Sequence, residues 1–137
     1  MDWTALCYFH NQHLALDNLL DDLCSQSVQP KRLVIVDDDS DKPIDAIKAP
    51  FDIVYMSYKA NGDVEKAMDM GVSAVRTKWV MPTLPWVRHD RFAAERAMRR
   101  LREEKDPMAV DPSTMMRNTK ATGWLLHGKG AVGRKNG

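Results

Sequence analysis

A short apolar segment that runs directly into a cluster of aspartates constrains this chain more than any other feature. Residues 32–36 read RLVIV, and four of the five residues that follow, 37–41, are aspartates. An uninterrupted apolar run of strand length is typical of a parallel strand that is buried on both faces of its sheet. The aspartates then lie at the carboxyl end of that strand, where open α/β sheets bind their ligands.

Strand-like and helix-like patterns alternate along the first part of the chain. We expect strands at 4–9, 32–36, 51–57 and 78–81, helices at 12–26 and 63–76, and one helical turn at 44–48. Pro82 is expected to end the last of these strands. Alternation of this kind predicts an α/β fold, in which an open, mainly parallel sheet has helices on both faces.

The last fifty residues have a different character. A basic helix is expected over 89–105, on the surface or against a partner, because its apolar residues form no wide stripe. Those residues are Phe92, Ala93, Met98 and Leu101. The apolar segment 121–127 is a candidate edge strand, and the Gly-rich, basic segment 128–137 is expected to be a flexible tail. We expect one domain, with an α/β core at 1–87 and residues 88–137 as its C-terminal extension.

The net charge of +1 conceals an uneven distribution. Residues 1–87 contain 8 Lys and Arg against 13 Asp and Glu, a net charge of −5. Residues 88–137 contain 12 against 6, a net charge of +6. This asymmetry predicts internal pairing or an anionic ligand near the second half, and an uneven solvated surface is the alternative. The nearly neutral whole argues against a strong non-specific nucleic-acid binder.

Composition excludes the membrane and disulfide-rich classes. No apolar run approaches the roughly 18–20 residues that a membrane span needs, and the first residues do not resemble a signal peptide. Two cysteines, Cys7 and Cys24, are too few for a disulfide framework, and we expect both to be reduced and buried. We therefore expect a cytoplasmic protein with no membrane partner.

The three adjacent carboxylates Asp37, Asp38 and Asp39 repel one another and contribute nothing to packing. Sequences tolerate such a cluster where a cation, a ligand hydroxyl or an imino N–H compensates the charges. The structural alternative is an Asx-rich turn that leads into the next segment. The pattern alone leaves both interpretations open.

Two blocks of the sequence resemble family 2 glycosyltransferases, which have the GT-A fold. The first block carries the turn, helix end and V-D-D-x-S pattern of the family on Asn11, Gln26, Ser27, Pro30, Val36, Asp37, Asp38 and Ser40. The second block is similar to the N-x-G-x-x-x-A segment of the family on Asn61, Gly62, Ala67, Gly71 and Ala74. The resemblance covers residues 3–82 and implies a truncated, Rossmann-like GT-A domain.

The resemblance implies a site for a nucleotide-diphosphate sugar, usually a UDP-sugar. Phe9 and Asn11 would line the pocket for the base. Asp38, with Asp37 beside it, would accept a hydrogen bond from the uracil N–H or from a ribose hydroxyl. The remaining matches would lie near the base and the ribose: Asn61 and Gly62.

The sequence departs from the family after the fourth expected strand. There the family carries a D-x-D motif that holds Mn²⁺ or Mg²⁺ on the diphosphate, whereas residues 79–86 read WVMPTLPW and contain no acid. Mn²⁺ or Mg²⁺ is a cofactor only if other residues replace this motif, and His89 with Asp90 either does so or simply begins a helix. Without a metal the leaving diphosphate needs cationic side chains, and Lys129 and Arg134 are the candidates.

Two functions from different classes fit these patterns. The first is a glycosyltransferase-like protein that binds a nucleotide-sugar donor and transfers the sugar to an acceptor, with catalytic residues that the sequence does not identify. The alternative is a catalytically degenerate GT-A-like protein, bacterial or from a phage, that acts as a binding or structural module. Its partner would be a protein or, through residues 88–137, a nucleic acid, and a homo-oligomer is compatible with both functions.

Overall fold

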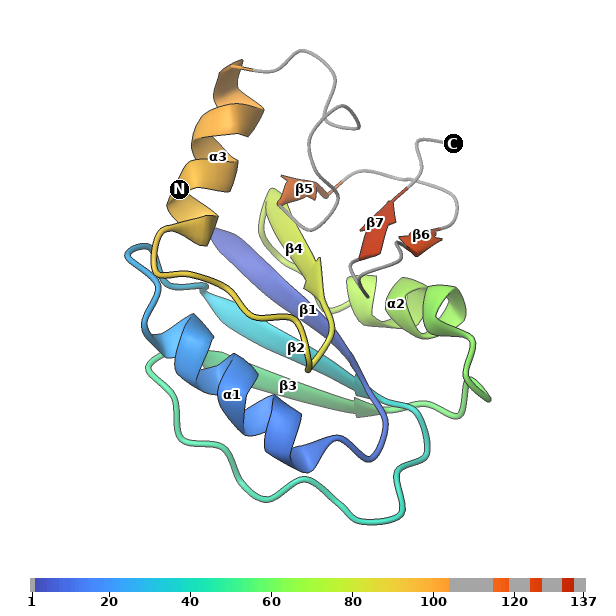
Figure 1. Ribbon diagram of the computed structural model, residues 1–137. Coiled ribbons are helices and arrows are strands. Elements are labelled where there is room, and N and C mark those ends of the chain that lie inside the picture. Colours follow the sequence, from blue (N-terminus) through green and yellow to red (C-terminus); the bar gives the residue numbers. More distant parts are fainter. Residues whose placement is uncertain (1, 104–114, 119–123, 127–131, 135–137) are drawn as a thin grey trace.

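The computed structural model describes residues 2–103, 115–118, 124–126 and 132–134, and for the last two segments it describes the backbone alone (Figure 1). The elements in chain order are β1 (Trp3–Phe9), α1 (His13–Cys24), β2 (Arg32–Asp37), β3 (Asp52–Ser57), α2 (Val64–Val72), β4 (Trp79–Thr83), α3 (Ala93–Glu103), β5 (Met116–Arg117), β6 (Trp124–Leu126) and β7 (Val132–Arg134). No helix in these segments has the length and apolar character that a membrane span requires.

The main sheet has five strands in the order β3-β2-β1-β4-β5. The strands β1 to β4 are mutually parallel, and only β5 runs antiparallel, at the edge beside β4. Every residue of β1 is buried, as are five of the six residues of β2. The prediction of an open, mainly parallel α/β sheet is confirmed, and its four parallel strands lie where the sequence pattern placed them.

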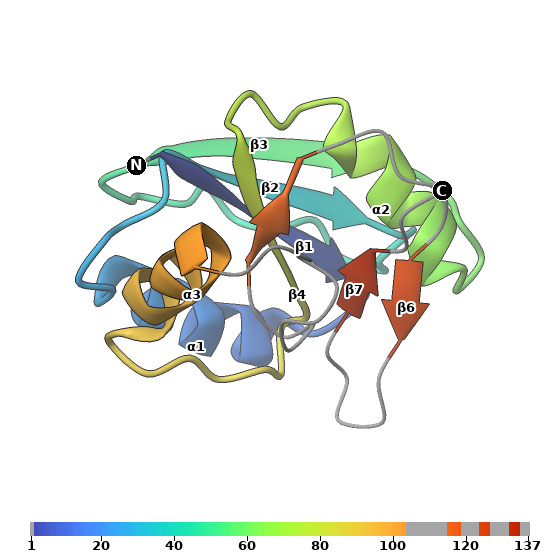
Figure 2. The same cartoon turned by 90° about the horizontal axis from the view of Figure 1, so that it is seen from above.

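Helices cover both faces of the sheet, as predicted. The first face carries α1 and α3, which Figure 2 shows together on one side of the strands. Alternate residues of β1 divide between the faces, so that Phe9 belongs to the core under α1 and Tyr8 to the core under α2. This alternation decides which side chain at the end of β1 can reach the loop that precedes α2.

The second face depends on a close contact between α2 and the two central strands. A Cβ atom at Gly71 would lie 2.5 Å from Cδ1 of Leu6 and 2.6 Å from Cγ2 of Val36, which no real Cβ contact tolerates. Glycine therefore allows the helix backbone to approach the sheet more closely than any other residue would. At Gly71 the backbone of α2 therefore packs directly against Leu6 and Val36.

The expectation of a surface helix without an apolar stripe was wrong for α3. The helix begins at Ala93, and Ala94, Ala97, Met98 and Leu101 form a buried stripe that packs against the α1 side of the core. The stripe was overlooked because two of its members are alanines, which bury little area but fit a close helix contact. At the start of the helix, buried Gln26 accepts a hydrogen bond from the backbone N–H of Ala94.

Other expectations also need correction. Residues 44–48 form no helix, because a five-residue segment between two prolines cannot offset the cost of helix nucleation. Strand β4 continues through Pro82 to Thr83, which is tolerated because β5 pairs only with Trp79 and Val80 and leaves the rest of that edge free of ladder partners in the described part of the chain.

The C-terminal strands also differ from expectation. The strand expected in the apolar segment 121–127 is confirmed as β6, which pairs antiparallel with β7 in a separate two-stranded sheet and not with the main sheet. Strand β7 lies inside the segment that was expected to be a flexible tail. Cys7 is buried as expected, whereas Cys24 is only partly buried, and both are free thiols.

Candidate functional site

A hollow of about 210 Å³ lies at the carboxyl ends of β1 and β2. It is bordered by the end of β1, the turn after β2 and the loop before α2, through Tyr8, His10, Asp38, Asp39, Asn61 and Gly62. Three of these are residues that the V-D-D-x-S and N-x-G patterns had selected. The structure thus brings residues from two sequence blocks, more than twenty positions apart, to one edge of the sheet.

The backbone around this edge adopts conformations that most residues avoid. Positive φ angles occur at Asn11 (58°), Asp39 (55°), Asn61 (53°) and Gly62 (84°) in the described part of the chain. Asn, Asp and Gly are the residues that adopt this left-handed region at least cost. All four lie in the three loops at the carboxyl edge of the sheet, and such clustering is typical of functional sites.

The carboxylate of Asp38 organises the loop that precedes α2. Its Oδ1 accepts the backbone N–H groups of Ala60 (2.6 Å) and Asn61 (3.1 Å). Its Oδ2 accepts the N–H of Gly62 (2.7 Å) and the phenolic hydroxyl of Tyr8 (2.6 Å). Asp38 is 3% exposed, so four donors of the protein itself compensate a buried negative charge.

These hydrogen bonds determine the protonation states of Asp38 and Tyr8. Burial alone raises the pKa of Asp38, but the hydrogen bonds from Tyr8, Gly62, Ala60 and Asn61 outweigh burial and hold the pKa below its usual value. Burial, and then the hydrogen bond to Asp38, raises the pKa of Tyr8 far above its usual value. At neutral pH the pair is therefore a carboxylate that accepts from a protonated phenol.

Asp37 has a separate set of partners. Its Oδ1 accepts the backbone N–H of Ser40 (3.1 Å) and the Ser40 hydroxyl, and its Oδ2 accepts the hydroxyl of Tyr55 from β3. Burial, together with this hydrogen bond, raises the pKa of Tyr55 to about 12. Asp37 therefore closes the turn over residues 37–40 with its side chain.

Asn11 fixes the turn after β1 against the turn after β2. Its backbone N–H donates to Oγ of Ser40 (2.9 Å), and its side-chain Oδ1 accepts the N–H of Asp41 (2.8 Å). The ring Nδ1 of His10 lies 2.6 Å from the carbonyl oxygen of Asp38 and adds a second link between the two turns. Asn11 does not border the hollow, and its contacts are those of a residue that positions the site.

The exposed side chains of Asp39 and Asn61 border the hollow and take no part in the hydrogen bonds around Asp37 and Asp38. The carboxylate of Asp39 forms an ion pair with Lys59, whose Nζ lies 3.9 Å away, and both side chains are mostly exposed. Asn61 contributes its backbone N–H to Asp38 and is itself exposed. These two residues, with His10, are the groups that a bound molecule would meet first.

The other expected site residues lie elsewhere. Phe9 is completely buried in the core under α1, with its ring edge-on to His13 at 5.1 Å between ring centroids, so the structure does not bring it to the hollow. Lys129 is outside the described residues, and only the backbone of Arg134 is described, at the end of β7.

Sequence reasoning missed Tyr8, His10 and Tyr55. The alternation of side chains along β1 could have indicated that residue 8, rather than residue 9, faces the α2 side of the sheet.

The carboxyl end of β4 lacks acidic ligands. Oγ1 of Thr83 and Nε2 of His89 lie 2.9 Å apart, and burial lowers the pKa of His89 against the opposing charges of Asp22 and Asp90. Asp90 accepts the N–H of Phe92 (2.9 Å) and pairs with Arg96, so it caps the start of α3. Among the described residues no three His, Cys, Asp or Glu side chains converge as ligands of a metal ion.

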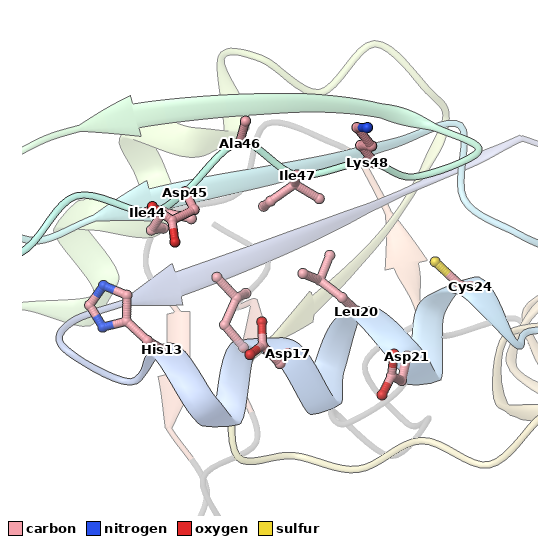
Figure 3. A pocket seen from close by; sticks show the side chains of 11 residues that line it. His13, Asp17, Leu20, Asp21, Cys24, Ile44, Asp45, Ala46, Ile47 and Lys48 are labelled. Atoms are coloured by element: carbon pink, nitrogen blue, oxygen red, sulfur yellow. The ribbon is translucent and has the colours of Figure 1, made fainter.

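A larger hollow of about 400 Å³ lies between α1 and residues 44–48, on the other side of the sheet from α2 (Figure 3). Leu16, Leu20, Ile44 and Ile47 form its apolar floor. Three aspartates line it against one lysine: Asp17, Asp21, Asp45 and Lys48. This acidic surplus disfavours a phosphate-bearing ligand in the larger hollow. The hollow at the ends of β1 and β2 is the better candidate for a nucleotide because of its position at the carboxyl ends of the parallel strands.

The parallel sheet, with Asp37 and Asp38 at the end of its second strand and a polar hollow beside them, has the arrangement of a GT-A domain, and solved structures share this fold. Residues 6–83, more than half of the chain, match the family described as Glycosyl transferase family 2, and the chain belongs to this family. No curated protein sequence matches the chain significantly.

Solved structures with the same fold include the S. aureus protein TarS. Its 1–349 fragment in complex with UDP-GlcNAc has a TM-score of 0.65 and 17% identity over 75% of this chain and 32% of that chain. The fragment in complex with UDP has a TM-score of 0.62 and 15% identity over 75% of this chain and 32% of that chain. The TarS crystal structure has a TM-score of 0.61 and 15% identity over 75% of this chain and 20% of that chain. The chain therefore spans a third or less of the length of these proteins.

Proposed function

We propose that this domain binds the nucleoside diphosphate of a nucleotide-sugar donor at the hollow beside Asp38. The observation that carries the proposal is the position of this hollow, at the carboxyl ends of β1 and β2 in a family 2 glycosyltransferase domain. Two structures of TarS with the same fold hold UDP and UDP-GlcNAc, which makes a uridine nucleotide the first ligand to test.

The described contacts separate residues that shape the hollow from residues that can contact a ligand. Asp37, Asp38 and Asn11 are occupied by bonds within the protein and shape the hollow, whereas Asp39 and Asn61 are exposed on its border. We assign the ribose hydroxyls to Asp39, because an exposed carboxylate accepts two hydroxyl donors without displacing a partner inside the core. Gly62 lies beside them and has no Cβ that would obstruct a ligand.

Isothermal titration of the full chain with UDP, UDP-GlcNAc and uridine tests the proposal. We expect all three to bind. We expect Asp39→Asn to weaken the binding of uridine about tenfold, the effect of losing a hydrogen bond to a charged group. Asp41→Asn is the matched control, because Asp41 is an exposed aspartate of the same turn that does not border the hollow. Failure of all three ligands to bind at millimolar concentration would refute the proposal.

The negative charge of the bound diphosphate also needs a positively charged partner. Since no three metal-ligating side chains converge among the described residues, we propose that cationic side chains take this role, with Lys129 and Arg134 as candidates. The double variant Lys129→Ala and Arg134→Ala should then weaken UDP more than uridine, and Mn²⁺ should leave the affinity for UDP unchanged. A marked increase in affinity with Mn²⁺ would instead indicate a metal site.

A binding module without transfer activity is the second candidate. It is favoured by the carboxyl end of β4, where the sequence has no acid before Asp90 and Asp90 caps α3. The two candidates differ in turnover: a transferase releases UDP from UDP-GlcNAc over time in the presence of an acceptor or of water, whereas a module binds it unchanged. Chromatographic detection of free UDP separates them.

A further inference from the structure

The carboxylate of Asp38 has no free acceptor position. Two oxygens of a carboxylate offer about four lone-pair sites. In this protein four donors fill them: three backbone N–H groups from residues 60–62 and the hydroxyl of Tyr8. A ligand can therefore bond to Asp38 only if one of these donors leaves.

Of the four donors, the Tyr8 hydroxyl differs from the others. The three N–H groups belong to the backbone that leads into α2, and this helix is packed on the sheet through Ala67, Met68 and Gly71. The hydroxyl is the one side-chain donor, and Tyr8 itself borders the hollow. The carboxylate oxygen that Tyr8 occupies is thus the one that a ligand in the hollow would otherwise reach.

Nucleobases differ most sharply in what they offer a carboxylate. Uracil has a donor at N3–H, whereas cytosine, which has nearly the same size, has an acceptor at N3. A carboxylate that faces N3 therefore selects uracil over cytosine, because the donor of cytosine, its N4 amino group, lies beside that position and N3 itself places a second acceptor against the carboxylate. A carboxylate that is already satisfied by the protein provides no such selection.

We propose that Tyr8 is a specificity-determining residue that makes the site tolerant of the base. Its hydroxyl takes the position on Asp38 that would distinguish uracil from cytosine, so the domain binds UDP and CDP with similar affinity. This inference rests on the proposed function, because it concerns the base of the nucleotide that the hollow binds.

The protein contains a matched control for this residue. Tyr55 also donates its hydroxyl to a buried aspartate, Asp37, and its pKa is likewise raised by burial and by that bond. Tyr55 does not border the hollow. Removal of its hydroxyl therefore frees a carboxylate oxygen that a ligand in the hollow does not face.

The experiment is a titration of wild type, Tyr8→Phe and Tyr55→Phe with UDP and with CDP. We expect wild type to bind the two within about threefold of each other. Tyr8→Phe should shift the ratio about tenfold in favour of UDP, the effect of one additional hydrogen bond to a charged group. Tyr55→Phe should leave the ratio as it is in wild type.

A measurement on wild type alone protects the test against a Tyr8 variant that fails to fold. Uridine and 3-methyluridine should bind wild type equally, because the N3–H is not used. Strong discrimination by wild type in either comparison, or an unchanged ratio in folded Tyr8→Phe, would overturn the inference while leaving nucleotide binding intact. Absence of binding by every nucleotide would overturn the proposed function, and the inference with it.

Discussion

The turn after β2 and the loop before α2 are both held by an aspartate at the end of the same strand, but in different ways. Asp37 bonds to Ser40, three residues ahead, and to Tyr55 on the neighbouring strand. Asp38 bonds to backbone groups 22 to 24 residues ahead and to Tyr8, 30 residues behind. One carboxylate closes a local turn, and its neighbour joins three distant segments.

This difference shows what the acidic cluster is for. A run of three carboxylates suggests a cation or a ligand that compensates them, yet two of the three are compensated by donors of the protein. Only Asp39 remains on the exposed border, with Lys59 nearby. The aspartates therefore serve first to hold separate segments of the chain together. The capacity of the cluster to bind a ligand depends on the carboxylate that these bonds leave exposed, Asp39.

The largest effect is expected from Asp38→Ala. This change leaves a buried hydroxyl and three N–H groups without their acceptor and loosens residues 60–62. We expect the free energy of unfolding to fall by about 3 kcal/mol or more, measured by urea denaturation. If the loss were no greater than that for Asp37→Ala, the distinction between a local turn and a long-range joint would have no energetic basis.

A smaller loss is expected from Asp37→Ala. Ser40 keeps water as a partner in its half-buried position, and the hydroxyl of Tyr55 is close to solvent on a side chain that is 45% exposed. We expect about 1–2 kcal/mol by the same urea measurement. Ser40→Ala removes part of the same turn and should cost less than Asp37→Ala.

The pH dependence of stability should separate the aspartates further. The folded pKa of Asp38 lies below its usual value of 3.8, so the folded state binds a proton there less readily than the unfolded state. Its contribution to stability is therefore present above about pH 4 and is lost as the pH falls through the folded pKa. Urea midpoints from about pH 6 to pH 3 should fall less steeply for Asp38→Asn than for wild type.

In the same titration Tyr8→Phe provides the intermediate case. It removes one of the four bonds that lower the pKa of Asp38, so the gap between the folded and the unfolded pKa narrows and its midpoints should fall less than those of wild type and more than those of Asp38→Asn. Identical curves for the three proteins would show that other groups control the acid sensitivity.

The smallest effect is expected from Gly62→Ala. No atom lies within 4 Å of the Cβ that alanine would add, but the φ angle of +84° is strained for any residue with a side chain. The cost should be about 1 kcal/mol in urea denaturation, because only the backbone conformation is penalised. A much larger loss would indicate that the loop had moved away from Asp38.

The sequence predicted the local features well and the long-range ones poorly. Strand and helix positions follow from apolar periodicity, and the turn that Asp37 closes with Ser40 lies within four residues. The bonds of Asp38 depend on a loop that the chain reaches only after another strand, and no periodicity specifies them. Strand β5 is two residues long, too short for any pattern, and the stripe of α3 was hidden because alanines contribute half of it.

The close contact at Gly71 has a consequence for the opposite end of its helix. Helix α2 is fastened at two points: at Gly71 against Leu6 and Val36, and through residues 60–62 to Asp38. A methyl group added at Gly71 would push the C-terminal end of α2 away from the sheet. The loop at the other end of the helix, which carries Gly62 and borders the hollow, would then be displaced as well.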